Sequence, residues 1–332
     1  MKIITTGTRV LKSQTKLIFG VAVGVLVGGS ASAIVLAAIP DSNGVIHACY
    51  KNGGGPVNII DSSTQSCSSK ETAITWNSAT TGQYLSSLVG ADFTDTSLSN
   101  QNFAGADLHN STFGSIGGSD TSMNRASFIG SNLSNTLFTN YLAMNNTDFT
   151  GANFTGATFD GGSNNIAYGA KFTNANFSNV NFLGSFNSGN PATPIDFRGA
   201  IFNGATINNG SSFSNANFPN VDFRGVHFTA AGFNGGDLSG TNFGGITLAN
   251  TSMLVDSLAN ANFSSSNLNN DSFVVGNVSN TNFSNAHIVN TNFGANDYTQ
   301  AIFTGATWSN VTCPDQTNSN NNGNTCIGHL AP

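Results

Sequence analysis

The amino-acid sequence predicts a coil of five-residue repeats around a continuous apolar interior. Between Ser279 and Trp308 a large apolar residue recurs every five positions, at Phe283, Ile288, Phe293, Tyr298, Phe303 and Trp308. An α-helix returns to one face about every 3.6 residues and a flat strand about every 2, so neither element keeps these side chains together. With 26 Phe in 332 residues, the chain is also richer in aromatics than disordered chains are. A packed core is therefore expected.

The same spacing extends over most of the chain. Before the final series, the large apolar residues are Leu88, Phe93, Leu98, Phe103, Leu108, Phe113, Met123, Phe128, Leu133, Phe138, Phe149, Phe154, Phe159, Phe172, Phe177, Phe182, Phe197, Phe202 and Ile207. From Phe213 to Trp308 the spacing runs without interruption. Two residues before most of these side chains lies a small residue, often Ala, and the residue between them is often Asn or Asp.

This pattern of small, Asn/Asp, Phe/Leu, polar and polar residues resembles the pentapeptide-repeat family over about two thirds of the chain. The resemblance implies an all-β fold, a right-handed quadrilateral β-helix in which each repeat forms one side and four repeats form one coil. We expect this β-helix over residues 81–308, with about eleven coils at a spacing of about 4.8 Å.

The distribution of Phe gives an independent test of the four-sided coil. In the uninterrupted series, every second large position from Phe213 to Phe303 is Phe, with Met253 as the exception, whereas the intervening positions are mostly other apolar residues. Four sides place these two sets on opposite pairs of sides, and three sides would mix them. The expected core repeat residues include Phe213, Phe223, Phe243, Phe263, Phe283 and Phe303.

Some residues interrupt the repeat. The count slips near Ala143, near Asn164 and from Asn187 to Pro194, where excursions from the coil are expected. Asp256 and Asp271 occupy the small inward position. We interpret these two as hydrogen-bonded turn residues rather than as a catalytic acid and base.

The first 40 residues have the pattern of an export signal. Four basic residues precede an uncharged stretch from Leu17 to Pro40. Cleavage after Ala33 would suit a signal peptide, but the apolar residues that follow make the stretch long enough to span a bilayer as a retained anchor. Both alternatives place the rest of the chain outside the cytoplasm.

The cysteines form two local pairs, one at each end of the body. An oxidising compartment favours disulfides between Cys49 and Cys67, in a small module over residues 41–80, and between Cys313 and Cys326, in an Asn-rich cap over residues 309–332. Zinc binding is the weaker alternative. Asn318, Asn320, Asn322 and Gly323 resemble part of a calcium loop, but no later Glu completes it, so a disulfide-closed cap that covers the end of the coil is preferred.

The sequence carries no recognisable catalytic constellation, so neither an enzyme nor a cofactor or metal site is predicted. His227 and His287 should lie in one column three coils apart, about 14 Å, which is too far to share a metal. After residue 40 the chain has six basic and 16 acidic residues, and this excess of negative charge disfavours direct nucleic-acid binding.

These observations predict an exported, noncatalytic scaffold at the cell surface or secreted, attached to the membrane if the N-terminal segment is uncleaved. Its partner, a protein or a cell-envelope polymer, and its oligomeric state stay open. The resemblance supplies an alternative, because some acidic members of the family imitate DNA and bind DNA gyrase. Gyrase is cytoplasmic, so the compartment of the chain separates the two hypotheses.

Overall fold

The computed structural model describes residues 45–51, 57–77, 88–115, 121–140, 142–160, 165–208 and 210–332. The predicted export segment lies outside these residues, as do Asn164 and parts of the predicted module over residues 41–80. No helix within the described ranges is long and apolar enough to cross a bilayer.

The first described element is a small antiparallel sheet. It consists of β1 (Val45–Lys51), β2 (Val57–Ile60) and β3 (Glu71–Asn77) in the order β2-β1-β3. Cys49 in β1 is paired with Cys67, which lies between β2 and β3, with 5.3 Å between their Cα atoms. The disulfide thus ties the connection between β2 and β3 to the central strand.

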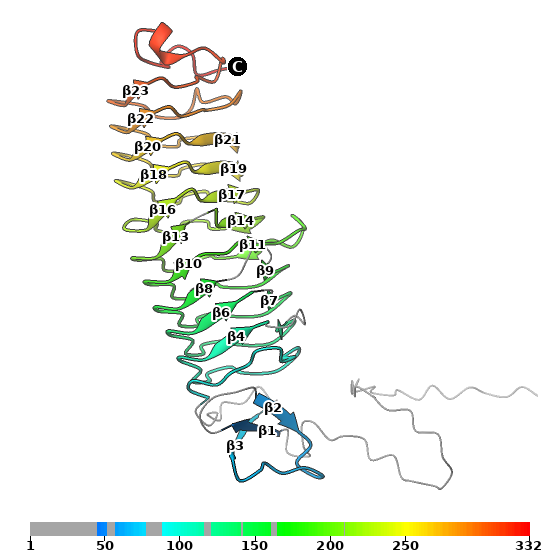
Figure 1. Ribbon diagram of the computed structural model, residues 1–332. Helices are drawn as coiled ribbons and strands as arrows, with labels where there is room; N and C mark the ends of the chain where they lie inside the picture. The colour runs from blue at the N-terminus through cyan, green and yellow to red at the C-terminus, as the bar shows by residue number, and fades with distance from the viewer. Residues whose placement is uncertain are drawn as a thin grey trace, which may run out of the picture. The chain divides into compact units, whose positions relative to one another are not determined.

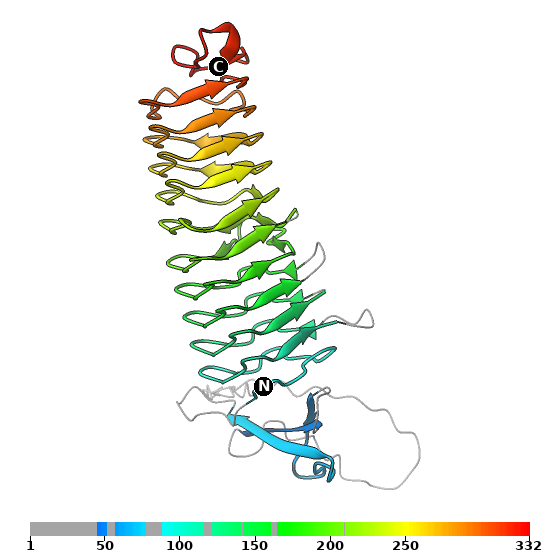
Figure 2. The same cartoon turned by 60° about the vertical axis from the view of Figure 1, so that its left-hand side comes forward.

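From Leu88 onward the chain forms a parallel β-solenoid whose coils are stacked in Figures 1 and 2. Its strands are β4 (Thr112–Gly114), β5 (Thr121–Ser122), β6 (Leu137–Thr139), β7 (Leu142–Ala143), β8 (Thr158–Asp160), β9 (Asn165–Ile166), β10 (Asn181–Phe182), β11 (Phe186–Asn187), β12 (Ile195–Asp196), β13 (Thr206–Asn208), β14 (Ser212–Ser214), β15 (Ala216–Asn217), β16 (His227–Thr229), β17 (Gly232–Asn234), β18 (Thr247–Ala249), β19 (Ser252–Ser257), β20 (Asn267–Asn269), β21 (Ser272–Asn277), β22 (His287–Val289) and β23 (Thr307–Ser309). A short 3-10 helix, η1 (Ser319–Asn321), follows. The all-β prediction is confirmed.

Each coil has four sides, which we name after the inward residues of one coil: the Phe263, Leu268, Phe273 and Val278 sides. Strands β18, β20, β22 and β23 form a sheet on the Leu268 side, and β14, β17, β19 and β21 belong to the sheet on the Phe273 side. The other two sides are joined mainly by isolated parallel bridges. After Phe213, each residue pairs with the residue 20 positions later. This register is the one that four five-residue sides require.

Phenylalanine rings fill the interior in columns. Phe263 is fully buried and stacks between Phe243, at a centroid distance of 4.7 Å, and Phe283, at 5.0 Å. Phe273, on the opposite side, packs edge-on against Phe263 at 5.6 Å. The two Phe-rich sides therefore face each other across the coil, as the alternation in the sequence predicted.

The corners depend on Asn and Gly. The Ala261 amide donates to the Leu258 carbonyl, which closes a four-residue turn, and Asn260 within it has a φ of 60°. Such left-handed backbone favours Gly, and Asn among the other residues. Gly240, with a φ of 65°, holds the same corner one coil earlier. The last polar position of the repeat is therefore a conformational requirement.

The slips in the count have different structural forms. Ala143 lies within β7 rather than in a loop. The coil that contains it has one extra residue, so Phe138 pairs with Phe159, 21 rather than 20 positions later. The excursion after β11 is a closed loop, in which the Ser188 hydroxyl donates to the carbonyls of Asn190 and Thr193. The chain returns to the coil at β12.

The prediction that Asp256 points inward is wrong. Strand β19 stays extended for six residues, so Met253 and Val255 both face the interior and Asp256 faces solvent. Its carboxylate accepts a hydrogen bond from the Gly236 amide. Asp271, in contrast, is buried with 3% of its surface exposed.

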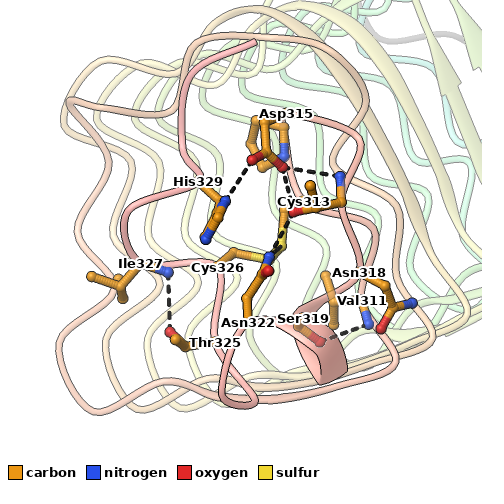
Figure 3. The surroundings of a disulfide bond; sticks show 12 residues. Val311, Cys313, Asp315, Asn318, Ser319, Asn322, Thr325, Cys326, Ile327 and His329 are labelled. Atoms are coloured by element: carbon orange, nitrogen blue, oxygen red, sulfur yellow. Dashed lines mark hydrogen bonds and ion pairs between the residues drawn. A yellow bond between two sulfur atoms is a disulfide. The ribbon is translucent and has the colours of Figure 1, made fainter.

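The C-terminal residues close the last coil, as Figure 3 shows. Cys313 and Cys326 are paired, and both are fully buried. The Ser319 hydroxyl accepts from the Val311 amide, and Asp315 lies 2.5 Å from His329 Nδ1. These contacts hold the cap together, and the Tyr298 amide, which donates to the Leu330 carbonyl, joins it to the end of the solenoid.

Candidate functional site: two surfaces at one corner of the solenoid

The sequence Asp-Phe-Arg-Gly occurs twice, at residues 196–199 and 222–225. In both copies the Phe is buried, and the Asp and Arg on either side of it point outward and pair. Arg198 Nη2 lies 2.6 Å from Asp196 Oδ2, and Arg224 Nη2 lies 2.7 Å from Asp222 Oδ2. Each Arg begins the turn that follows, and its main-chain amide donates to the carboxylate of the Asp two residues earlier, which keeps the two charges on the same outer surface.

These ion pairs fix the charge of both aspartates. Burial opposes ionisation of Asp196, but the hydrogen bonds and positive charge of Arg198 outweigh it and hold the pKa of Asp196 below its usual value. At Asp222 the hydrogen bond from Arg224 is the main cause, and it also lowers the pKa of that carboxyl. Both aspartates are ionised at neutral pH, and each guanidinium stays largely exposed.

A groove of about 550 Å³ lies at the corner between the Val278 and Phe263 sides. We call it the corner groove, and it is lined by Gly199, Ala200, Ile201, Asn203, Asn220, Asp222 and Arg224. Ile201 has 51% of its surface exposed, although its outward column is otherwise mostly polar. The groove therefore combines an exposed aliphatic side chain with an exposed arginine.

A second surface runs along the Val278 side. The outward residues of this side continue from Asn102 and Ser127 to Asn277, and we call the segment from Asp148 to Ser257 the charged column. Its residues in successive coils are Asp148, Lys171, Asp196, Asn217, Asp237 and Ser257. Within the column Lys171 Nζ lies 3.7 Å from Asp148 Oδ2, and the Asn217 side chain accepts from the Asp237 amide. A second groove, of about 570 Å³, crosses this column and is lined by Lys171, Arg198 and Asp237, among others.

The excursion after β11 borders the charged column. Pro194, at its end, lines the same groove as Lys171 and Arg198. Gly189 approaches Tyr168 so closely that an added Cβ would lie 2.9 Å from the Tyr168 hydroxyl oxygen. The loop is thus seated on the coil below it, and glycine permits that contact.

The residues that the sequence singled out lie elsewhere. Phe213, Phe223, Phe243, Phe263, Phe283 and Phe303 are all buried in the interior, and the two disulfides lie before and after the solenoid. His227 and His287 belong to β16 and β22 on the Leu268 side, and His287 Nδ1 lies 2.7 Å from Thr307 Oγ1. The corner surfaces were not predicted, although the repeated Asp-Phe-Arg-Gly was a signal for them.

The asparagines that resembled a calcium loop bond to the protein itself. The Asn318 side chain accepts from the Asn320 amide, and the Asn320 side chain accepts from the Asn310 amide. The Asn322 side chain donates to Thr317 Oγ1. Across the described residues, no group of three or more His, Cys, Asp or Glu side chains is placed to hold a metal.

Family models for pentapeptide repeats match the chain at residues 195–237 and at residues 86–114 and 143–162. The first match spans both copies of Asp-Phe-Arg-Gly and the corner groove. A search of curated proteins finds no match.

Solved structures with similar folds include HetL, a pentapeptide repeat protein involved in heterocyst differentiation regulation from the cyanobacterium Nostoc sp. strain PCC 7120. It is 16% identical, the match covers 69% of this chain and 92% of HetL, and the TM-score is 0.30. QnrB1, a plasmid-mediated fluoroquinolone resistance protein, is 18% identical in one structure, with coverage of 68% of this chain and 82% of QnrB1 and a TM-score of 0.31.

Proposed function

Because this chain is a pentapeptide-repeat protein, we propose that it is an exported, noncatalytic scaffold that binds a protein partner through the corner groove. The observation that carries the proposal is the exposed Ile201 beside the Asp222–Arg224 ion pair. The proposal narrows the two partners left open by the sequence, a protein or a cell-envelope polymer, to a protein.

The interior supports a scaffold. Its inward positions are occupied by apolar side chains packed ring against ring, such as Phe243, Phe263 and Phe283. A core of this kind stabilises the coil through burial of apolar surface and requires no bound group. The surfaces are then available for recognition, as in other solenoids.

The chemistry of the corner groove favours a protein partner. Arginine is enriched among residues that dominate binding energy at protein interfaces, and apolar contacts supply the centre of such interfaces. Arg224 is 63% exposed in its side chain, so it can meet a partner while its carboxylate contact holds its orientation. Ile201 provides the apolar contact next to it.

Two features support export. The N-terminal sequence has a basic start followed by an uncharged apolar stretch, which is the pattern of a secretory signal or an anchor. The structure also contains the disulfides Cys49–Cys67 and Cys313–Cys326, and disulfides persist mainly in oxidising compartments. We therefore place the scaffold outside the cytoplasm, at the cell surface or secreted.

The alternative of a DNA-imitating protein that binds gyrase has less support. A DNA duplex presents a dense, regular series of negative charges. Along the charged column, however, Lys171 separates Asp148 from Asp196, and Arg198 neutralises Asp196. On the adjacent side, Arg224 neutralises Asp222. The surface is mixed in charge rather than phosphate-like.

The groove is tested with a double substitution, Ile201→Asp with Arg224→Glu. Intact cells that produce the full chain are treated with a membrane-impermeant crosslinker, and the crosslinked partner is identified by mass spectrometry. We expect the substitution to reduce the crosslinked species about tenfold or more, because it removes the apolar contact and reverses the adjacent charge.

Ile302→Asp is the matched control. Ile302 occupies the same position of the repeat on the same side and is 44% exposed, but it lies outside the corner groove. It should leave the crosslinked species unchanged, and all variants should keep the circular dichroism of the unmodified protein. Equal crosslinking of the groove variant, or equal loss with Ile302→Asp, would show that the partner binds elsewhere.

A further inference from the structure

The charged column is self-complementary when it is read in the two opposite directions. From Asp148 to Ser257 its six outward residues are a carboxylate, an ammonium, a carboxylate, an amide, a carboxylate and a hydroxyl. If a second copy lies antiparallel against this side, the first residue of the column in one copy lies opposite the last residue of the column in the other. Asp148 then faces Ser257, Lys171 faces Asp237, and Asp196 faces Asn217 of the second copy.

The Lys171–Asp237 and Asp148–Ser257 pairings join a donor to an acceptor with unused capacity. The Asp196 carboxylate, in contrast, already accepts from Arg198 and Thr173. Lys171 has 59% of its side chain exposed, and its contact with Asp148 at 3.7 Å leaves other ammonium hydrogens available. The Asn217 side chain uses its oxygen for the Asp237 amide, so its NH₂ group can donate to a carboxylate. Asp237 accepts from the Ser239 amide through Oδ1, which leaves Oδ2 available.

The Lys171–Asp237 pair cannot form within one chain. Lys171 and Asp237 are three coils apart along the column, or about 14 Å at the usual strand spacing. That distance exceeds the reach of an ion pair, so the complementarity of Lys171 and Asp237 is available only to another molecule.

The charges also select the register of the two copies. A shift by one coil in one direction places Asp148 opposite Asp237 and Asp196 opposite itself. A shift by one coil in the other direction places Asp196 opposite Asp237. Both shifts bring carboxylates together, which costs binding energy, whereas the unshifted register pairs no like charges.

We propose that a second copy of this chain binds along the charged column in an antiparallel, twofold-symmetric arrangement, with Lys171 of each copy paired to Asp237 of the other. A twofold interface uses the same patch on both partners, which is the property that this column has. The inference goes beyond the protein partner of the corner groove and does not depend on it.

The test uses charge reversal in the full chain, with association measured by analytical ultracentrifugation. Lys171→Asp places carboxylates opposite Asp237, and Asp237→Lys places ammonium groups opposite Lys171. Each variant alone should therefore associate about tenfold or more weakly than the unmodified chain. In an equimolar mixture the two variants regain opposite charges at both contacts, so the mixture should form a heterodimer.

The mixture keeps the test decisive, because a heterodimer can form only if both variants are folded. Arg224→Ala is the control, since it alters the corner groove and should leave self-association unchanged. An unmodified chain that stays monomeric up to high concentration would overturn the proposal. So would a mixture that fails to associate, or an association that neither substitution weakens, as expected if the N-terminal apolar residues caused it.

Discussion

Phe263→Ala is expected to lower the free energy of unfolding by about 3 to 5 kcal/mol. Phe263 is fully buried and packs against Phe243, Phe273 and Phe283. Removal of the ring deletes apolar burial and leaves a cavity that the hydrogen-bonded coils above and below cannot close. Thermal or denaturant unfolding followed by circular dichroism measures the change.

Ser264→Ala is the control, because Ser264 is the next residue and points outward. Its main-chain amide donates to the Asn262 side chain, a bond that the substitution keeps. The control should change stability by less than about 0.5 kcal/mol. Equal losses for the two variants would mean that the inward and outward positions of the repeat are assigned incorrectly.

Asp271→Thr is expected to stabilise the protein at neutral pH and to remove a pH dependence. Burial raises the pKa of Asp271 to about 6, although the Thr251 and Asn269 amides oppose the shift. One carboxylate oxygen, Oδ2, has no hydrogen-bond partner in the described structure. Threonine occupies the corresponding position in both adjacent coils, at Thr251 and Thr291, so the substituted side chain fits this corner.

The raised pKa of Asp271 determines how stability changes with pH. Below about pH 4 the carboxyl is protonated in both the folded and the unfolded chain and has no effect on the balance. Between about pH 4 and pH 6 the unfolded chain ionises this carboxyl while the folded chain keeps it protonated, so the unmodified protein loses up to about 3 kcal/mol of stability over this range. Asp271→Thr should show a smaller loss over the same range.

Asp297→Asn is the control, because the pKa of Asp297 is shifted in the opposite direction from that of Asp271. The hydrogen bonds from Thr299 lower the pKa of the exposed Asp297, so its contribution is present at neutral pH and disappears as the pH falls. Unfolding midpoints measured between about pH 2 and pH 8 separate the two effects, because the contribution of Asp297 is lost below about pH 4 and that of Asp271 changes above it. A pH profile that Asp271→Thr leaves unchanged would show that this carboxyl ionises without cost in the fold.

The repeat could be predicted because the same geometry is required in every coil. A large apolar residue must recur wherever the chain turns back to the interior, and this gives Phe263 and Phe283 the same role 20 residues apart. An insertion of five residues, however, keeps the five-residue phase and therefore cannot be detected from the sequence. Phe113 pairs with Phe138 rather than with the residue 20 positions later, although the phase of the repeat continues through Met123.

The five-residue pattern also could not predict local changes of backbone conformation. Asp256 was assigned to the interior because the period alone places it there, but β19 remains extended past the expected turn and Val255 takes the inward place. Val275 repeats this in β21, where it pairs with Val255. Two β-branched residues in register favour extended backbone, a preference that a fixed five-residue pattern does not contain.

The corner surfaces depend on contacts between coils. The residues of the charged column are separated by 20 to 25 positions, and these separations vary because of the insertions. Only the register of the folded coil shows that Lys171 lies between Asp148 and Asp196. The repeated Asp-Phe-Arg-Gly could have indicated two surface ion pairs, since an Asp side chain readily accepts from the main-chain amide two residues later and so lies beside that residue's side chain.

The compartment and the N-terminus of the mature chain test the proposed scaffold most directly. Fractionated cells, protease treatment of intact cells and sequencing of the amino terminus measure both together. We predict a protease-accessible chain outside the cytoplasm that begins either at Ile34 after cleavage or at Met1 with a retained anchor, and that has both disulfides formed. A soluble cytoplasmic chain with free thiols at Cys49, Cys67, Cys313 and Cys326 would contradict the account and favour the gyrase alternative.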